Sequence, residues 1–228
     1  MNNNSLWSDA LYRLTRNKAA MLGGFILILL IISAVLAPWI APYSYSYQDL
    51  NLGASPPSGE HLLGTDILGR DLLSRILYGA RISLLVGFVA TGVALVIGVS
   101  WGIVAGYVGG RVDSIMMRIV DILYGIPFII FVILLMVIFG RNLILLFMAI
   151  GAVEWLTMAR IVRGQTISIK EKEFIEASKS LGQSSFMIII KHIIPNLAGT
   201  IIVYITLMVP SVIILESFLS FLGLGVQE

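Results

Sequence analysis

The sequence has no cysteine and only 2 histidines among its 228 residues. The absence of cysteine excludes a disulfide framework and a thiolate metal site. Charge is scarce as well, because 12% of the residues are charged whereas soluble domains carry roughly 25%. The formal net charge is only +2, and the basic residues are scattered over several segments. Both observations argue against a nucleic-acid-binding surface. With 58% hydrophobic residues, this composition is typical of an integral membrane protein.

Uncharged apolar runs recur along the chain and are long enough to cross a hydrocarbon core about 30 Å thick as helices. Because the alternating pattern of barrel strands is absent, the runs predict an all-α polytopic membrane protein. The five expected spans are Ala19–Ile40, Ile82–Val108, Ile122–Gly140, Leu143–Ala159 and Leu197–Val226. The fifth run is too long for one straight crossing. We therefore expect it to bend or stop near Pro210 to Glu216, with Leu219–Gly225 in the outer interface.

A cleaved signal peptide is the main alternative for the first run. The apolar core of a signal peptide covers roughly 7 to 15 residues, and this run is longer. Pro38 also follows Ala37 directly, the only plausible small-residue cleavage site. We therefore expect an uncleaved span. Residues 1–81 would form an N-terminal segment with the first span and an outer loop, and residues 82–228 a transmembrane domain.

The distribution of Lys and Arg predicts the orientation of the spans, because cytoplasmic loops carry an excess of both. One side would carry Arg13, Arg16, Lys18, Arg111, Arg118, Arg160, Arg163, Lys170, Lys172, Lys179 and Lys191. The other side would carry Arg70, Arg75, Arg81 and Arg141. The N-terminus is therefore predicted to be cytoplasmic.

The predicted outer loop, Pro42–Arg81, is long enough to contain its own helix. Apolar residues fall on one face of the stretch "LLSRILYGA" and polar residues on the other. Thr65 or Asp66 is expected to cap this helix. The pattern predicts an interfacial helix that leads into the second span, and a simple anchor for that span is the alternative.

Glycines recur every fourth residue along the second span and just beyond it. They are Gly98, Gly102, Gly106 and Gly110. This spacing puts them on one helical face, where small residues let a second helix approach closely. The pattern predicts tight helix packing rather than a substrate site.

A polar stretch, "KEKEFIEASKSLGQSSFMIIIKHIIPN" from residue 170 to 196, interrupts the apolar chain. Phe174, Ala177 and Leu181 share a face of a short helix, and Gly182 can supply the left-handed residue that ends it. Ser184 or Ser185 can cap a second short helix before Pro195 and the fifth span. A connection of this length is usually functional, with a solvated surface loop as the alternative.

Within this stretch, "EASKSLGQSSFMIIIKHIIP" resembles the EAA loop of ATP-binding-cassette (ABC) importer permeases. The family pattern is Glu-Ala-Ala, three residues, Gly, and then Ile-x-Leu-Pro, and Glu176, Ala177, Gly182 and Pro195 match it. Ser178 replaces the second Ala, His192 stands at the Ile position and Ile194 replaces Leu. The segments "HLLGTDILGRDLLSRILYGARISLL", "KHIIPN" and "ESFLSFLGLGVQ" are similar to the C-type permease subunit of dipeptide, oligopeptide and nickel importers.

This resemblance implies a type I ABC importer transmembrane domain in a bacterial inner membrane. The helix with Glu176, Ala177, Ser178 and Gly182 would be the coupling helix, which docks on a separate ATPase subunit. The implied partners are two ATPase subunits that bind ATP and Mg²⁺, a homologous B-type permease and an extracytoplasmic binding protein. No cofactor is expected in this chain, and the cargo could be di- or oligopeptides, nickel complexes or glutathione.

The family normally continues after "FLGLGVQ" with a sixth span, so a chain that ends at Glu228 is expected to be a fragment or a truncated product. A stand-alone ion-coupled transporter or channel is the alternative of a different class. Its ion sites would be Glu154 and Glu216, because carboxylates within spans are costly and usually functional. Structural or gating roles are the other interpretation of the two glutamates. An enzyme is disfavoured because His61 and His192 have no nucleophile at a recognisable spacing.

Overall fold

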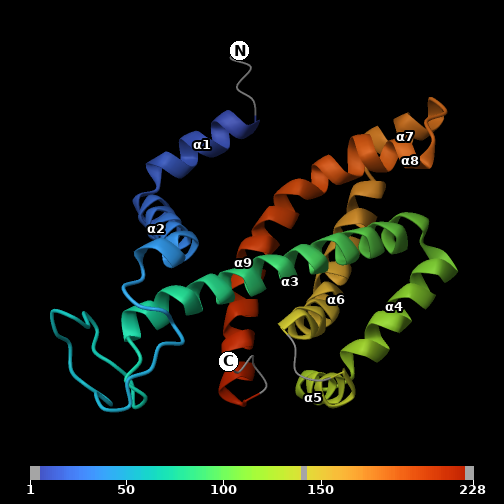
Figure 1. The fold of residues 1–228 in the computed structure, drawn as a ribbon. Helices are drawn as coiled ribbons and strands as arrows, with labels where there is room; N and C mark the ends of the chain where they lie inside the picture. Colours follow the sequence, from blue (N-terminus) through green and yellow to red (C-terminus); the bar gives the residue numbers. More distant parts are fainter. Residues whose placement is uncertain (1–5, 140–142, 224–228) are drawn as a thin grey trace. The chain divides into compact units, whose positions relative to one another are not determined.

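The structure, a computed structural model, describes residues 6–139 and 143–223 (Figure 1). Within these residues every regular element is a helix, and the only strand-like pairing is a single bridge between Thr65 and Asp71. The all-α prediction is confirmed for this part of the chain. By its contacts the chain divides into two compact units, Met1–Leu84 and Leu85–Glu228.

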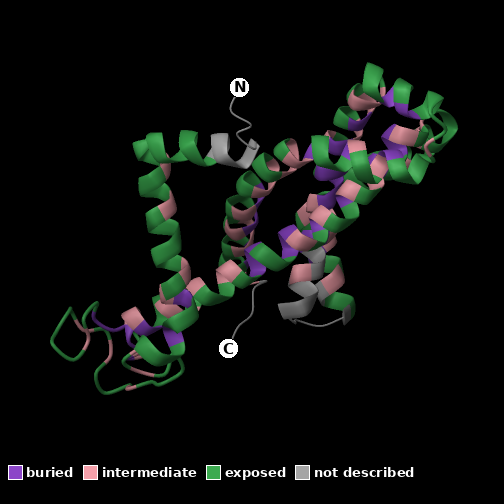
Figure 2. Ribbon diagram, turned by 90° about the horizontal axis from the view of Figure 1, so that it is seen from above, coloured by how far each residue is buried: buried purple, intermediate pink, exposed green. Residues whose placement is uncertain are grey.

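The first unit begins with two helices that meet at Asn17. Helix α1 spans Leu6–Arg16 and helix α2 spans Lys18–Ile40. Asn17 starts α2 because its Oδ1 accepts a hydrogen bond from the Ala20 amide at 3.1 Å. The 23 residues of α2 make a helix about 35 Å long, and most of its side chains are exposed (Figure 2). The predicted first span is therefore one helix of sufficient length to cross a bilayer.

Residues 41–71, called the first loop below, are held together by hydrogen bonds between residues of the same segment. The Thr65 hydroxyl donates to the Gly53 carbonyl at 2.6 Å. Asp66 accepts from the Arg70 amide at 3.0 Å and from the Arg70 Nε at 2.9 Å. These contacts fold the chain back on itself without regular secondary structure, so the first loop has a defined conformation of its own.

Helix α3 runs without a break from Leu72 to Val108. It begins at Asp71, whose Oδ2 accepts a hydrogen bond from the Ser74 amide at 2.8 Å. The predicted cap at Thr65 or Asp66 is wrong, because those side chains are engaged within the first loop. The predicted helix in this segment is confirmed, and it continues into the second span as one helix of 37 residues. Its location at the membrane interface stays a prediction.

The predicted third span, Ile122–Gly140, is not one straight helix. Helix α4 spans Gly110–Tyr124, helix α5 spans Phe128–Phe139, and the two are bent by 80°. The break precedes Pro127, which has no N–H to donate and disfavours a helical conformation in the residue before it. Because α5 alone is about 18 Å long, only the bent pair has the length of a single crossing. Gly140 lies outside the described residues.

The last long helices differ from the prediction at their ends. Helix α6 spans Leu143–Lys170, so it contains the predicted fourth span and continues past Ala159. Helix α9 spans Ile194–Phe221 and continues through Pro210. Of the two predicted outcomes near Pro210 to Glu216, a stop is therefore wrong and a bend stays a prediction. Apolar membrane-type helices do tolerate an internal proline. Leu219, expected in the outer interface, is fully buried, and residues 224–226 lie outside the described part.

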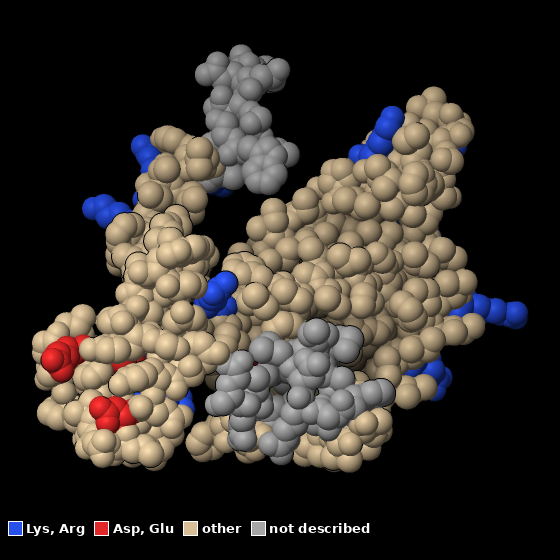
Figure 3. All heavy atoms as spheres, in the orientation of Figure 1, with Lys and Arg blue, Asp and Glu red and all other residues tan. Residues whose placement is uncertain are grey.

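Five spans were predicted, and the described residues support three or four by length and composition. The three are α2, α3 and the segment Ser185–Phe221, and the bent α4–α5 pair could be a fourth. In the second unit, uncharged atoms cover most of the face shown in Figure 3, with Lys and Arg at its edges. This distribution fits helices that lie in lipid along their middle parts.

Helices α3 and α6 lie against each other in the second unit and run in the same direction. A Cβ atom built on Gly98 would lie 2.7 Å from the Met158 Cβ, and one on Gly106 would lie 2.8 Å from the Thr166 Cβ. The contacting residue numbers rise together along both helices, so the helices are parallel. The chain must cross between them, which places the C-terminal ends of α3 and α6 on the same side.

The glycine stripe explains this close approach for three of its four members. A Cβ atom on Gly102 would lie 2.6 Å from the Ala159 carbonyl oxygen, too close for any side chain, as in small-residue helix packing. Gly110 does not belong to the stripe. It is the first residue of α4, with φ of +57°, and a Cβ atom there would meet open space.

Two ion pairs connect α4 to α6. The Arg163 Nη2 lies 2.6 Å from the Asp113 Oδ2, and the Arg160 Nη2 lies 2.8 Å from the Asp121 Oδ1. The Arg160 guanidinium also lies over the Tyr124 ring, 4.4 Å from its centroid. Residue numbers rise along α4 as they fall along α6 at these contacts, so α4 and α6 are antiparallel.

Candidate functional site: the polar loop

The polar loop, residues 171–196, begins where α6 ends. A short helix, α7, spans Glu173–Ser180. Its first turn carries Glu173 and Glu176, and its last turn carries Lys179. Acidic side chains at the N-terminal end and a basic one at the C-terminal end suit the helix dipole, so the sequence supports a helix here despite its short length.

Gly182 ends α7 as predicted. Its φ is +77°, a left-handed conformation. The Gln183 amide donates to the Ser178 carbonyl at 3.1 Å, and the Gly182 amide donates to the Lys179 carbonyl at 2.9 Å. These two bonds form a Schellman motif. A Cβ atom on Gly182 would meet nothing within 4 Å, so the space around this turn is open.

The second predicted short helix is not separate. Ser184 caps it as predicted, because its Oγ accepts from the Met187 amide at 3.4 Å. Helix α8, Ser185–Ile188, then continues through a π-helix, Ile189–Ile193, into α9. Pro195 lies in the first turn of α9, and the helix therefore begins well before the proline that was expected to mark its start.

The inner face of α7 packs on the rest of the second unit. Ile175 and Ser178 are buried, and Ile175 shares a core with Ile188 and Ile193. This burial fixes which side of α7 faces outward. The outward side carries Ala177, so the predicted coupling residues divide between the two faces.

Large apolar side chains on the outer side are uncovered. They are Phe174, Leu181, Phe186 and Met187. Leu181 is 83% exposed and Phe186 is 72% exposed, although both lie in the most polar part of the chain. Exposed apolar side chains in a polar segment are a feature of interaction sites. The sequence prediction did not include Phe186, and a large apolar residue two positions after a helix cap in a polar segment was the available signal.

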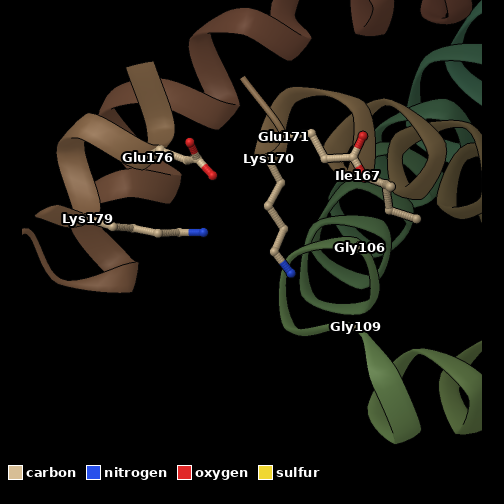
Figure 4. Close-up of a pocket in the computed structure, with 7 residues that line it drawn as sticks. All are labelled: Gly106, Gly109, Ile167, Lys170, Glu171, Glu176 and Lys179. Atoms are coloured by element: carbon tan, nitrogen blue, oxygen red, sulfur yellow. The ribbon is translucent and has the colours of Figure 1, made fainter. Parts of the chain in front are cut away.

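A cleft of about 380 Å³ lies beside α7 (Figure 4). It is lined by Gly106, Gly109, Ile167, Lys170, Glu171, Glu176 and Lys179. In Figure 4 the Glu176 and Lys179 side chains reach from α7 toward the side of the cleft where Lys170 lies. The cleft places the predicted coupling residue Glu176 near the C-terminal ends of α3 and α6.

The two glutamates that were predicted to lie within spans, Glu154 and Glu216, are outside the polar loop in the sequence. Glu154 is half-buried on α6, next to the buried Trp155, and Glu216 is half-buried on α9. Among residues 6–139 and 143–223, no three His, Asp or Glu side chains gather closely enough to hold a metal ion.

Comparison with known proteins identifies the family. Residues 98–227 match the family described as "Binding-protein-dependent transport system inner membrane component". The chain belongs to this family. Residues 5–57 match the N-terminal TM domain of oligopeptide transport permease C. The protein is thus a multi-pass inner-membrane component of a transport system, and its family is one of permeases rather than catalytic subunits.

Similar permeases occur in several bacteria. The oligopeptide transport system permease protein OppC of Haemophilus influenzae is 52% identical over 226 residues, covering 98% of this chain and 73% of the relative. The dipeptide transport system permease protein DppC of Bacillus subtilis is 52% identical over 223 residues, covering 98% of this chain and 70% of the relative. For OppC of Escherichia coli K12 the values are 51% over 226 residues, 98% and 75%.

Proposed function

We propose that this chain is the C-type, membrane-spanning permease subunit of an ATP-driven importer for di- and oligopeptides. The names of its relatives, oligopeptide and dipeptide transport permeases, support this cargo class. An extracytoplasmic binding protein would deliver the peptide, and a homologous B-type permease would complete the pathway. The transmembrane domain would have the type I importer fold, in which the bent α4–α5 pair forms one of the crossings.

The proposed orientation places the N-terminus and the polar loop in the cytoplasm. The excess of Lys and Arg on that side supports it. The parallel α3 and α6 also support it, because their C-terminal ends, near Gly109 and Lys170, share a side. Cysteines introduced at Ser5 and Ser184 should react only with cytoplasmic reagents. Labelling of either one from outside intact cells would contradict this orientation.

ATP would be bound by two separate ATPase subunits. The sequence of this chain contains no G-x-x-x-x-G-K-[ST] motif. The observation that carries the proposal is the exposed apolar surface of the polar loop, led by Leu181 and Phe186. Phe186 is the second residue of the apolar segment Ser185–Phe221, so the proposal places this end of the segment beyond the lipid, where an exposed apolar surface fits a protein partner. The open space at Gly182 leaves room for that partner to close on α7, so that ATP-driven closure moves α6 and α9.

The test is reconstitution of the full chain with its B-type permease, ATPase subunits and binding protein in liposomes. We expect the ATPase subunit to co-purify with the permease, and labelled peptide to enter only with ATP and the loaded binding protein. Uptake by the chain alone, driven by an ion gradient, would overturn the proposal. It would instead favour a secondary transporter that uses Glu154 or Glu216. In the importer those residues would have structural or gating roles.

A further inference from the structure

Two residues at which the polar loop departs from the permease pattern contact each other. Ser178 stands where the pattern has Ala, and His192 stands where it has Ile. The Ser178 Oγ and the His192 Nε2 are 3.4 Å apart, although 14 positions separate them in the chain. The same Nε2 lies 3.3 Å from the Gln183 Oε1. The three side chains therefore join α7, the turn after Gly182 and the π-helix.

The hydrogen-bond partners determine which atom of this network donates. The Ser178 hydroxyl donates its only proton to the Phe174 carbonyl at 2.8 Å, so its oxygen can only accept from His192. The Gln183 Oε1 is also an acceptor. The His192 Nε2 must therefore carry a proton that is shared between the two oxygens. An apolar side chain at this position would leave the Ser178 and Gln183 oxygens without this donor.

Directional bonds add to the apolar packing beneath α7. Ile175 of α7 is buried against the core that includes Ile188 and Ile193, which determines the inward side of α7, and the hydrogen bonds restrict the smaller rotations that non-directional apolar contact still permits. The His192 ring also lies 6.1 Å from the Phe174 ring, centroid to centroid. The π-helix widens the turn that carries His192, and such turns are frequent at functional sites.

We propose that His192 is a positioning residue, which fixes the orientation of α7 on the π-helix through Ser178 and Gln183. The outward face of α7 with Leu181 is then presented in one orientation to whatever docks there. The docking consequence rests on the proposed function, in which the partner is the ATPase subunit. The orientation itself does not depend on the partner, so the two claims can be tested separately.

The experiment compares His192→Gln with His192→Met in the full permease complex. The Gln side chain keeps an N–H at about the reach of Nε2, whereas the Met side chain has similar length and no donor. Ser178→Ala removes the acceptor and serves as a smaller change should His192→Met fail to fold. The first measurement is hydrogen exchange of the α7 amides without the ATPase subunit, and the second is the affinity for that subunit.

With His192→Met we expect faster exchange in α7 and about tenfold weaker binding of the ATPase subunit, the order expected for two modest hydrogen bonds. His192→Gln should restore most of both. Adding Ser178→Ala to His192→Met should cause little further change, because the two residues act as one pair. Unchanged exchange in His192→Met, or equal effects of Gln and Met, would overturn the proposal. Faster exchange with unchanged ATPase binding would support the positioning role and contradict the proposed docking site.

Discussion

The first loop and the polar loop are both rich in polar residues, yet they use these residues differently. In the first loop Asp66 and Asp71 are held by hydrogen bonds and ion pairs with residues of the same segment and the adjoining start of α3. In the polar loop the large apolar side chains Leu181 and Phe186 remain exposed. The first loop also exposes large apolar side chains, among them Leu50, Leu62 and Ile67. The two loops therefore differ in the bonded carboxylates of the first loop, and not in the exposure of apolar side chains.

Two of their left-handed glycines differ in their surroundings. Gly69 has φ of +70° and Gly182 has φ of +77°. A Cβ atom on Gly69 would overlap the Asp49 backbone, whereas one on Gly182 would meet open space. Gly53 of the first loop, with φ of +55°, also has open surroundings, so the open space at Gly182 allows a partner to approach but does not by itself indicate one.

The largest expected effect is on the stability of the first loop. The Asp71 side chain is 1% exposed, and its Oδ1 lies 3.0 Å from the His61 Nδ1. Because Asp71→Ala removes this pair and the cap of α3, it should lower the free energy of unfolding of the first unit by roughly 3 kcal/mol. Limited proteolysis in detergent would measure this loss. Replacing the exposed Glu60 with Ala is the control, and equal protease resistance of the two variants would show that the first loop does not depend on its network.

The next effect is on binding rather than folding. Leu181→Ser and Phe186→Ser remove exposed side chains, so each should change stability by less than about 0.5 kcal/mol. Each should weaken the ATPase complex by about 2 kcal/mol, or roughly 30-fold, if these side chains are the centre of the interface. The control is Leu62→Ser in the first loop, where the side chain is 61% exposed. Wild-type ATPase binding by both polar-loop variants would contradict the proposal that Leu181 and Phe186 form the docking surface.

The sequence predicted the elements of the polar loop that depend on local chemistry. Gly182 and Ser184 were both identified from helix-ending and helix-starting preferences, because a left-handed residue and a capping hydroxyl act within a few positions. The contact between Ser178 and His192 could not be predicted, because it depends on how a π-helix turns the chain. The exposure of Phe186 could not be predicted either, because the sequence alone does not show whether an apolar side chain is buried.

The same distinction explains the errors in the helices. The long helices were predicted from the apolar runs. The effect of proline was not, because the chain bends before Pro127 but continues as a helix through Pro210. Packing decides between them. The α3 glycines were predicted from spacing alone, and Gly110 was included wrongly because the four-residue spacing continued beyond the end of α3 at Val108.

Acid should destabilise the first loop gradually and by less than Asp71→Ala does. Low pH protonates the carboxyls of Asp66 and Asp71 but does not remove them. Burial raises the pKa of Asp66, but hydrogen bonds from the Arg70 amide and guanidinium and from the Leu68 amide outweigh it, so the pKa lies below its ordinary value of 3.8. Burial also raises the pKa of Asp71, but the hydrogen bonds from Ser74 and His61 outweigh it, so the pKa of Asp71 is lowered as well.

A carboxyl with a lowered pKa stabilises the folded chain at pH values above its unfolded pKa, and this contribution is lost as the pH falls through the folded pKa. We therefore expect the protease resistance of the first loop to be constant from pH 7 down to about pH 4 and to fall below it. An acid-active protease applied at a series of pH values measures this. A loss of resistance already near pH 6 would mean that other groups control the loop.

The smallest expected effect concerns Gly182. Gly182→Ala should lower stability by about 1 kcal/mol, because φ of +77° is strained for an alanine. Gly182→Asn should cost less, because asparagine tolerates the left-handed conformation. Gly59→Ala in the first loop is the control, since its Cβ atom would also meet open space and its φ is not positive. If strain alone matters, Asn should restore ATPase binding along with stability. If the partner fills the space at Gly182, both variants should bind the ATPase subunit more weakly, and Asn no better than Ala. Wild-type binding by the Ala variant would show that the partner approaches elsewhere, and the contrast between a filled and an empty glycine turn would then describe only the fold.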